Sequence, residues 1–214
     1  MTELAIVVII LRILIPLLII RFPVSGVIVA SIIDWLDFSV IGSFQHYQII
    51  DKWLDLWFLM ICAWQVRRWG DPLAKTIAWA LFAFRVVGNI VFSITDAQWL
   101  LVVFPDLFGI FYFFYVAFVQ LSKQPILFYK KIYLVPVFLS VGFTKMLQEY
   151  GLHIAYPYPD ITPDWVYNVL GWPLVIRFIL AIIAPTVVLI YLVIKARSTS
   201  ENDRIRTSHN KKDT

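Results

Sequence analysis

The stretch SIIDWLDFSVIGSFQHYQIIDKWLDLWFLMI, residues 31–61, places four aspartates inside two strongly apolar segments. Asp34 and Asp37 lie near the end of the first segment, and Asp51 and Asp55 lie near the start of the second. A carboxylate inside a bilayer is costly, so it needs a cation, a partner or water in order to remain there. These four aspartates are therefore the first candidates for a functional site.

The composition around this stretch indicates a membrane protein. Hydrophobic residues make up 61% of the chain and charged residues 15%, and the mean hydropathy is +0.81. Soluble domains carry about 25% charged residues. We therefore predict an all-α, polytopic transmembrane helical bundle of six to seven spans, forming one domain over residues 1–195 and followed by a disordered polar tail over 196–214. The expected spans are 3–20, 23–42, 49–67, 73–94, 98–121, 131–150 and 171–195.

The basic residues predict an orientation in the membrane. With seven spans, all of their groups fall on one side of the bilayer. By the positive-inside rule, the C-terminus lies in the cytoplasm and the turn after Asp37 lies outside, most simply in the plasma membrane. The net charge of +4 has the same origin and does not indicate a nucleic-acid partner. The groups are Arg21, Arg67 with Arg68, Lys123, Lys130 with Lys131, and the tail from Lys195.

Two further features yield weaker expectations. Cys62 is the only cysteine, which excludes an intramolecular disulfide, and we expect it to be a small packing residue. Glu149 and His153 stand four residues apart at the polar end of the sixth predicted span. That polar end is expected to reach the membrane interface, and a metal site made of this pair is the alternative.

Helical spacing brings the four aspartates together. Residues three or four apart share a helix face, so Asp34 and Asp37 form one pair, and Asp51 and Asp55 form another. Thirteen residues separate the pairs, enough for the chain to turn back, so the two helices are expected to be antiparallel neighbours. Three readings follow: a site for a divalent cation, internal ion pairs, or a proton or ion pathway. The expected partners for ion pairs are Arg12, Lys52 and Arg85.

The order of these residues resembles the CDP-alcohol phosphatidyltransferases over residues 8–58. Arg12 and Pro16 stand in the first span, Asp34-Trp-Leu-Asp37 ends the second, and Asp51-Lys-Trp-Leu-Asp55 opens the third. The resemblance implies that Asp34, Asp37 and Asp51, with Asp55 beside them, hold Mg²⁺ or Mn²⁺. It also implies that Asp55 is the general base for an acceptor alcohol, and that a CDP-linked lipid is the donor.

The chain departs from this family at several positions. Phe38 stands where the family has glycine, and Ile41 and Gly42 stand where it has alanine and arginine. The family's site faces the cytoplasm, whereas the charges here place the turn after Asp37 outside. We therefore expect a divergent metal-dependent phospho-alcohol transferase acting on lipid. The alternative is a non-enzymatic membrane protein, either an ion-coupled carrier or a structural partner.

Arginines within the spans are candidates for substrate binding. A guanidinium is well suited to hold a phosphate or carboxylate head group. A structural ion pair, for example with Asp106, is the alternative reading. The candidates are Arg12, Arg85 and Arg177.

Overall fold

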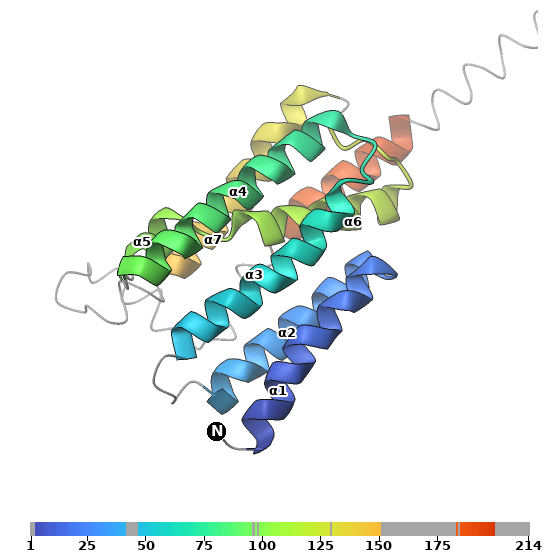
Figure 1. Cartoon of the computed structure of the whole chain (residues 1–214). Helices are drawn as coiled ribbons and strands as arrows, with labels where there is room; N and C mark the ends of the chain where they lie inside the picture. The colour runs from blue at the N-terminus through green and yellow to red at the C-terminus, as the bar shows by residue number, and fades with distance from the viewer. Residues whose placement is uncertain are drawn as a thin grey trace, which may run out of the picture.

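The computed structural model describes residues 3–41, 47–95, 97, 99–128, 130–150, 183 and 185–199. Throughout this described part the regular structure is helical and contains no strand, which confirms the predicted all-α class. The helices pack lengthwise into an elongated bundle (Figure 1). The elements are α1 (Glu3–Leu14), η1 (Ile15–Ile20), α2 (Pro23–Ile41), α3 (Tyr47–Val66), α4 (Pro72–Thr95), α5 (Trp99–Val103), α6 (Leu107–Ser122), η2 (Lys131–Tyr133) and α7 (Leu134–Tyr150), and residues 185–199 form a further helix.

The predicted helix over residues 98–121 is wrong as a single element. Phe104-Pro105-Asp106 separates α5 from α6, because proline has no N–H to continue the ladder and Asp106 caps the next helix. The Asp106 Oδ1 atom accepts a hydrogen bond of 3.0 Å from the Gly109 N–H. At the other end of the chain, the last helix continues to residue 199, past the expected start of the tail at 196, and residues 200–214 lie outside the described part.

One described helix, Pro72–Thr95, is long and apolar enough to cross a membrane. Four shorter apolar helices accompany it, each of 10 to 17 residues. The number of spans therefore stays a prediction. The shorter helices are Ile6–Ile20, Pro23–Asp34, Leu107–Ser122 and Lys131–Gly142.

The continuous segment α1–η1 and the next helix, α2, form a tight hairpin. Gly26 of α2 lies directly against η1, where an added Cβ atom would come within 2.7 Å of the Ile19 backbone nitrogen. The buried Gln65 side chain ties this hairpin to α3, because its Nε2 atom donates to the carbonyl oxygens of Ile19 (3.1 Å) and Ile20 (2.7 Å). These contacts hold the turn of the hairpin against the end of α3.

The core is centred on α3, α4 and α6 and also includes buried residues of η1, α2, α7 and the helix over 185–199. Cys62 is fully buried in it, which confirms its expected role in packing. Trp69 stacks on Tyr115 with ring centroids 3.8 Å apart, and the Tyr115 hydroxyl donates to the Pro125 carbonyl oxygen. Aromatic packing therefore holds α6 to the connection between α3 and α4.

Asp71 joins the start of α4 to the loop after α6. Its buried carboxylate accepts hydrogen bonds through Oδ1 from the Leu73 and Ala74 backbone N–H groups, each 3.1 Å. Through Oδ2 it accepts a third from the Phe128 N–H, at 2.9 Å. Asp71 is thus the N-cap of α4, a helix that begins with proline. The same side chain also makes a tertiary contact, because it holds the loop after α6 against the start of α4.

Replacing Asp71 by alanine is expected to lower the free energy of unfolding by about 2 to 3 kcal/mol, because a cap and a buried N–H lose a charged acceptor. Chemical unfolding of the purified protein in detergent measures this loss. Asp106→Ala is the matched control, since Asp106 caps α6 through one side-chain bond and should cost about 1 kcal/mol. Equal losses of unfolding free energy in the two variants would contradict a stabilising contact between Asp71 and the loop after α6.

The groups of basic residues meet at one end of the bundle. Lys75 Nζ donates to the Arg67 carbonyl oxygen, and Arg197 Nη2 donates to the Leu121 carbonyl oxygen. Lys195 lies over the ring of Tyr133. The candidate carboxylates lie toward the other end, where α2 finishes and α3 begins (Figure 1).

Candidate functional site

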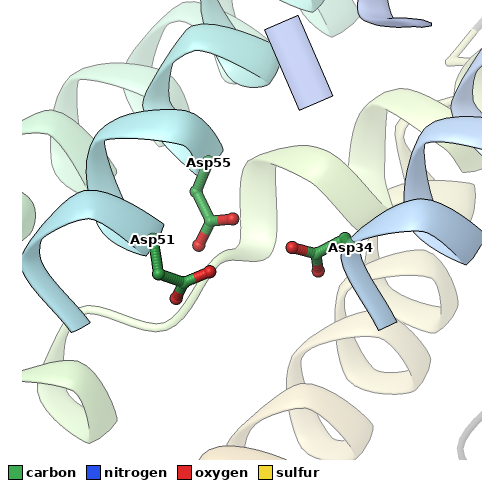
Figure 2. Close-up of side chains that lie close together, drawn as sticks. All are labelled: Asp34, Asp51 and Asp55. Atoms are coloured by element: carbon green, nitrogen blue, oxygen red, sulfur yellow. The ribbon is translucent and has the colours of Figure 1, made fainter. Parts of the chain in front are cut away.

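Three of the predicted aspartates converge in the structure. Asp51 and Asp55 project from successive turns of α3 toward Asp34 on α2 (Figure 2). One oxygen from each carboxylate lies within 4.8 Å of the others. We call Asp34, Asp51 and Asp55 the acid cluster.

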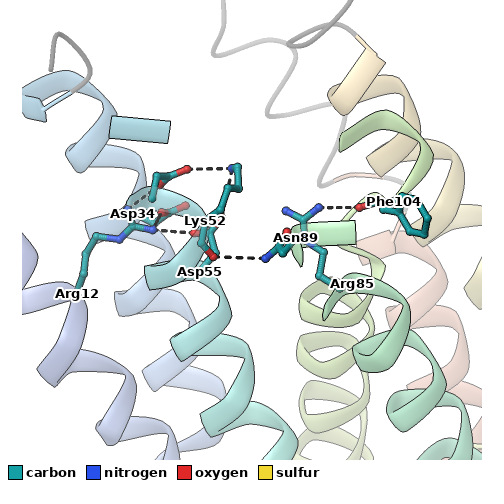
Figure 3. A network of polar contacts seen from close by, with 8 residues as sticks. Arg12, Asp34, Lys52, Asp55, Arg85, Asn89 and Phe104 are labelled. Carbon is teal, nitrogen blue, oxygen red and sulfur yellow. Dashed lines mark hydrogen bonds and ion pairs between the residues drawn. The ribbon is translucent and has the colours of Figure 1, made fainter. Parts of the chain in front are cut away.

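Arg12 lies between the three carboxylates of the acid cluster (Figure 3). Its Nη1 atom donates to Asp51 Oδ1 at 2.7 Å. Its Nη2 atom contacts Asp55 Oδ1 at 2.7 Å and also contacts Asp34 Oδ1. The Arg12 side chain is only 5% exposed, whereas the side chains of Asp51, Asp55 and Asp34 are 18%, 24% and 51% exposed, so the guanidinium is buried and the carboxylates are partly accessible.

The geometry of α1 positions Arg12. The helix changes to 3-10 form near Pro16, and the Ile13 carbonyl oxygen accepts a 2.9 Å hydrogen bond from the Trp57 Nε1 of α3. α1 packs against both α2 and α3, whereas the described residues of α2 and α3 pack little against each other. The two helices run antiparallel, as expected (Figure 1), and Arg12 of α1 bridges their carboxylates.

Lys52 provides a second positive charge at the acid cluster. Its Nζ atom lies 2.9 Å from Asp51 Oδ2 and 3.4 Å from Asp55 Oδ2. Among the described ion pairs, three carboxylates thus share two cations, so the cluster keeps one negative charge when all five groups are ionised. Two of the three predicted ion-pair partners, Arg12 and Lys52, make these contacts.

The acid cluster offers carboxylate oxygens, which are the ligands that a hard divalent cation prefers. Two oxygens on opposite sides of the ion are about 4.2 Å apart for Mg²⁺ and about 5 Å apart for Ca²⁺. The spread of 4.8 Å fits this range, with a small carboxylate rotation needed for Mg²⁺ or Mn²⁺. Because Arg12 contacts the same three carboxylates, a bound cation and the guanidinium would compete for them.

A second polar pair lies beside the acid cluster on α4. Arg85 and Asn89 are 3% and 4% exposed. Arg85 Nη1 donates to the Phe104 carbonyl oxygen at 2.6 Å, and Asn89 Nδ2 donates to the Lys52 carbonyl oxygen at 3.4 Å (Figure 3). Gly88 permits this approach, because an added Cβ would lie 2.3 Å from the Cβ of Phe104.

Several predicted residues cannot be placed in the site. Asp37 lies on α2 and Glu149 on α7, but their side chains are outside the described part of the structure. Arg177 and His153 are outside the described residues altogether. Trp57 was missed by the sequence reasoning, since a tryptophan in an apolar helix carries no signal of the carbonyl group it will meet.

Comparisons of the chain with protein-family models, with curated proteins and with solved structures found no match. The resemblance of residues 8–58 to the CDP-alcohol phosphatidyltransferases therefore stays a prediction. The geometry of the acid cluster is what supports a functional proposal.

Proposed function

We propose that the chain is a multispanning integral membrane protein of six to seven spans, and that it is a divergent, metal-dependent phospho-alcohol transferase of the CDP-alcohol type acting on lipid. The observation that carries this proposal is the convergence of Asp34, Asp51 and Asp55 from two helices onto a volume the size of one cation. Arg12 at the centre of the cluster adds support, because the resemblance pairs a first-helix arginine with these aspartates.

The surface of the bundle supports a membrane location. Large apolar side chains are exposed on several helices, including Ile94 (78%) and Ile132 (73%). Extended apolar surface of this kind requires a partner, and lipid is the simplest one. The basic end of the bundle then lies in the cytoplasm with the C-terminus, in the plasma membrane, and the acid cluster lies toward the opposite boundary.

The proposed roles follow from the donor set. Asp34, Asp51 and Asp55, with Asp37 on the next turn of α2, would hold Mg²⁺ or Mn²⁺, which neutralises the pyrophosphate of a CDP-linked donor. Asp55 would accept the proton of the acceptor alcohol. Arg12, once displaced from the carboxylates, would present its guanidinium fork to a phosphate group.

A direct assay tests the transferase. Purified protein in detergent micelles, where both membrane faces are accessible, is mixed with CDP-diacylglycerol, a panel of alcohols and Mg²⁺ or Mn²⁺. We expect CMP to be released, and we expect the release to stop on addition of EDTA and in the Asp55→Asn variant. Asp106→Asn, which changes an aspartate outside the cluster, should keep the activity. Absence of CMP release with every alcohol, from folded protein, would contradict the transferase.

The ion pairs favour a second candidate function. Arg12 and Lys52 already contact all three carboxylates, as expected if the cluster is a structural element of a non-enzymatic carrier or membrane partner. The location of the cluster away from the basic, cytoplasmic end also favours this candidate, since the family's site faces the cytoplasm. Under this second candidate, divalent cations leave the stability of the protein unchanged.

A further inference from the structure

Cations gather at the basic end of the bundle, where α3 and α6 finish and α4 and η2 begin (Figure 1). None of them is part of an ion pair within the described part of the chain. The acidic residue described at this end, Asp71, is buried, and backbone N–H groups engage its carboxylate. This end therefore carries uncompensated positive charge. Its exposed or half-exposed cations are Arg21, Arg67, Arg68, Lys75, Lys123, Lys130, Lys131, Lys195 and Arg197.

Many of these cations stand within three residues of a large, exposed apolar side chain. At a membrane boundary the apolar side chain meets the acyl chains, and the cation beside it reaches the head groups. A soluble polyanion, such as a nucleic acid, would leave the same apolar side chains in water. The pairs are Arg21 with Phe22, Arg67 with Trp64, Lys123 with Leu121, Lys131 with Ile132, and Lys195 with Ile194.

Aromatic rings hold two of the cations at this level. The Arg67 guanidinium carbon lies 3.8 Å from the centre of the Trp64 ring. The Lys195 Nζ lies 5.4 Å from the ring centre of Tyr133 and 5.3 Å from that of Tyr191. Tryptophan and tyrosine favour the head-group level of a membrane. These contacts therefore place Arg67 and Lys195 at the height of lipid phosphates.

The positions of three lysines are not explained by the fold. Lys130 and Lys131 stand at the start of η2, which leads directly into α7, and the positive end of a helix dipole disfavours cations there. Lys123 ends α6 in the left-handed conformation, with φ at 57°, where glycine would be less strained. An anionic partner at this surface would offset the unfavourable charge of Lys130 and Lys131.

We infer that the basic end binds anionic phospholipids of the surrounding leaflet, with Lys123, Lys130 and Lys131 as central contacts. The ligand is recognised by its negative charge and by its acyl chains, and it does not take part in a reaction. This binding requires the membrane location proposed above and none of the roles proposed for the acid cluster, which lies toward the other end of the bundle.

Quenching of tryptophan fluorescence by brominated lipids tests this binding. The full chain is reconstituted into phosphatidylcholine nanodiscs that contain brominated phosphatidic acid, phosphatidylserine or phosphatidylcholine as the probe. Both anionic probes should quench the wild type at mole fractions about fivefold lower than phosphatidylcholine, which corresponds to one cation near the head groups. Salt at about 1 M should remove most of this preference, because the Debye length falls to about 3 Å.

Two matched triple variants separate charge from side-chain size. The first replaces Lys123, Lys130 and Lys131 by glutamine, and the second replaces the same exposed residues by arginine. The glutamine variant should lose most of the anionic preference, and the arginine variant should keep it. If the glutamine variant does not fold, the salt dependence of the wild type decides alone. In detergent the glutamine variant should release CMP as the wild type does, since its substitutions lie away from the acid cluster.

The outcomes distinguish this binding from the other proposals. Equal quenching by all three probes, or a preference that survives high salt, would overturn it. A preference for only one of the two anionic lipids would also overturn it, because recognition would then depend on the head group and not on charge. Failure of the wild type to enter the nanodiscs would overturn the membrane location as well. Anionic preference without CMP release would contradict the transferase alone.

Discussion

Replacing Arg12 by leucine is expected to lower the free energy of unfolding by about 2 to 3 kcal/mol, because the partly buried Asp51 and Asp55 lose their main cation, while the half-exposed Asp34 loses less. Arg12 contacts Asp34, Asp51 and Asp55 at once, and the remaining cation, Lys52, pairs with Asp51 and Asp55. Chemical unfolding in detergent without divalent cations measures the loss.

The control for this prediction is Arg21→Leu. Arg21 is exposed at the end of η1, so the same substitution there should change the free energy of unfolding by about 0.5 kcal/mol or less. Millimolar Mg²⁺ should restore part of the stability of Arg12→Leu, since the carboxylates then lack a competing guanidinium. A loss no larger for Arg12→Leu than for Arg21→Leu would show that the cluster does not depend on this arginine.

Much of the helical framework was predictable from the sequence. Apolar runs of membrane length gave the positions of α2, α3 and α4 to within about two residues, since little except a helix satisfies the backbone of such a run. The division between α5 and α6 was not predicted. Pro105 stands in a continuous apolar stretch, and membrane helices often tolerate proline, so the pattern does not show that the chain breaks there.

The acid cluster was predictable in its members and not in its arrangement. The spacing of Asp51 and Asp55 within one helix fixes their shared face, and local periodicity is sufficient to see it. The contact of Arg12 with Asp51 joins residues 39 positions apart. It depends on the hairpin at Gly26 and on the bond from Trp57 to Ile13, which the sequence pattern does not encode.

The same limit applies to the Arg85 and Asn89 pair. Their spacing of four residues places them on one face of α4. Gly88 allows Phe104 to approach α4 closely. Arg85 therefore donates to the Phe104 backbone carbonyl and not to an aspartate. A single glycine in an apolar helix does not reveal which segment packs against it.

Asp51→Asn is expected to weaken the stabilisation of the protein by divalent cations, by about tenfold or more in the metal concentration required. The substitution keeps the shape and one oxygen of the side chain but removes a charged ligand. At a metal concentration one hundred times the Kd, the wild type should gain about 2.7 kcal/mol, which corresponds to about 5 to 10 °C in Tm for a chain of this size. The variant should reach such a rise only at concentrations about tenfold or more higher, because one ligand charge is missing.

The dependence of Tm on Mg²⁺, Mn²⁺ and Ca²⁺, measured in detergent for the wild type, Asp51→Asn and the control Asp106→Asn, tests the proposed cation site most directly. The proposal predicts a Tm that rises with metal concentration in the wild type and the control, and a much weaker rise in Asp51→Asn. A Tm that stays flat through millimolar concentrations of all three cations, with Asp51→Asn simply less stable, would contradict the cation site and leave the ion pairs with Arg12 and Lys52 as the function of the cluster.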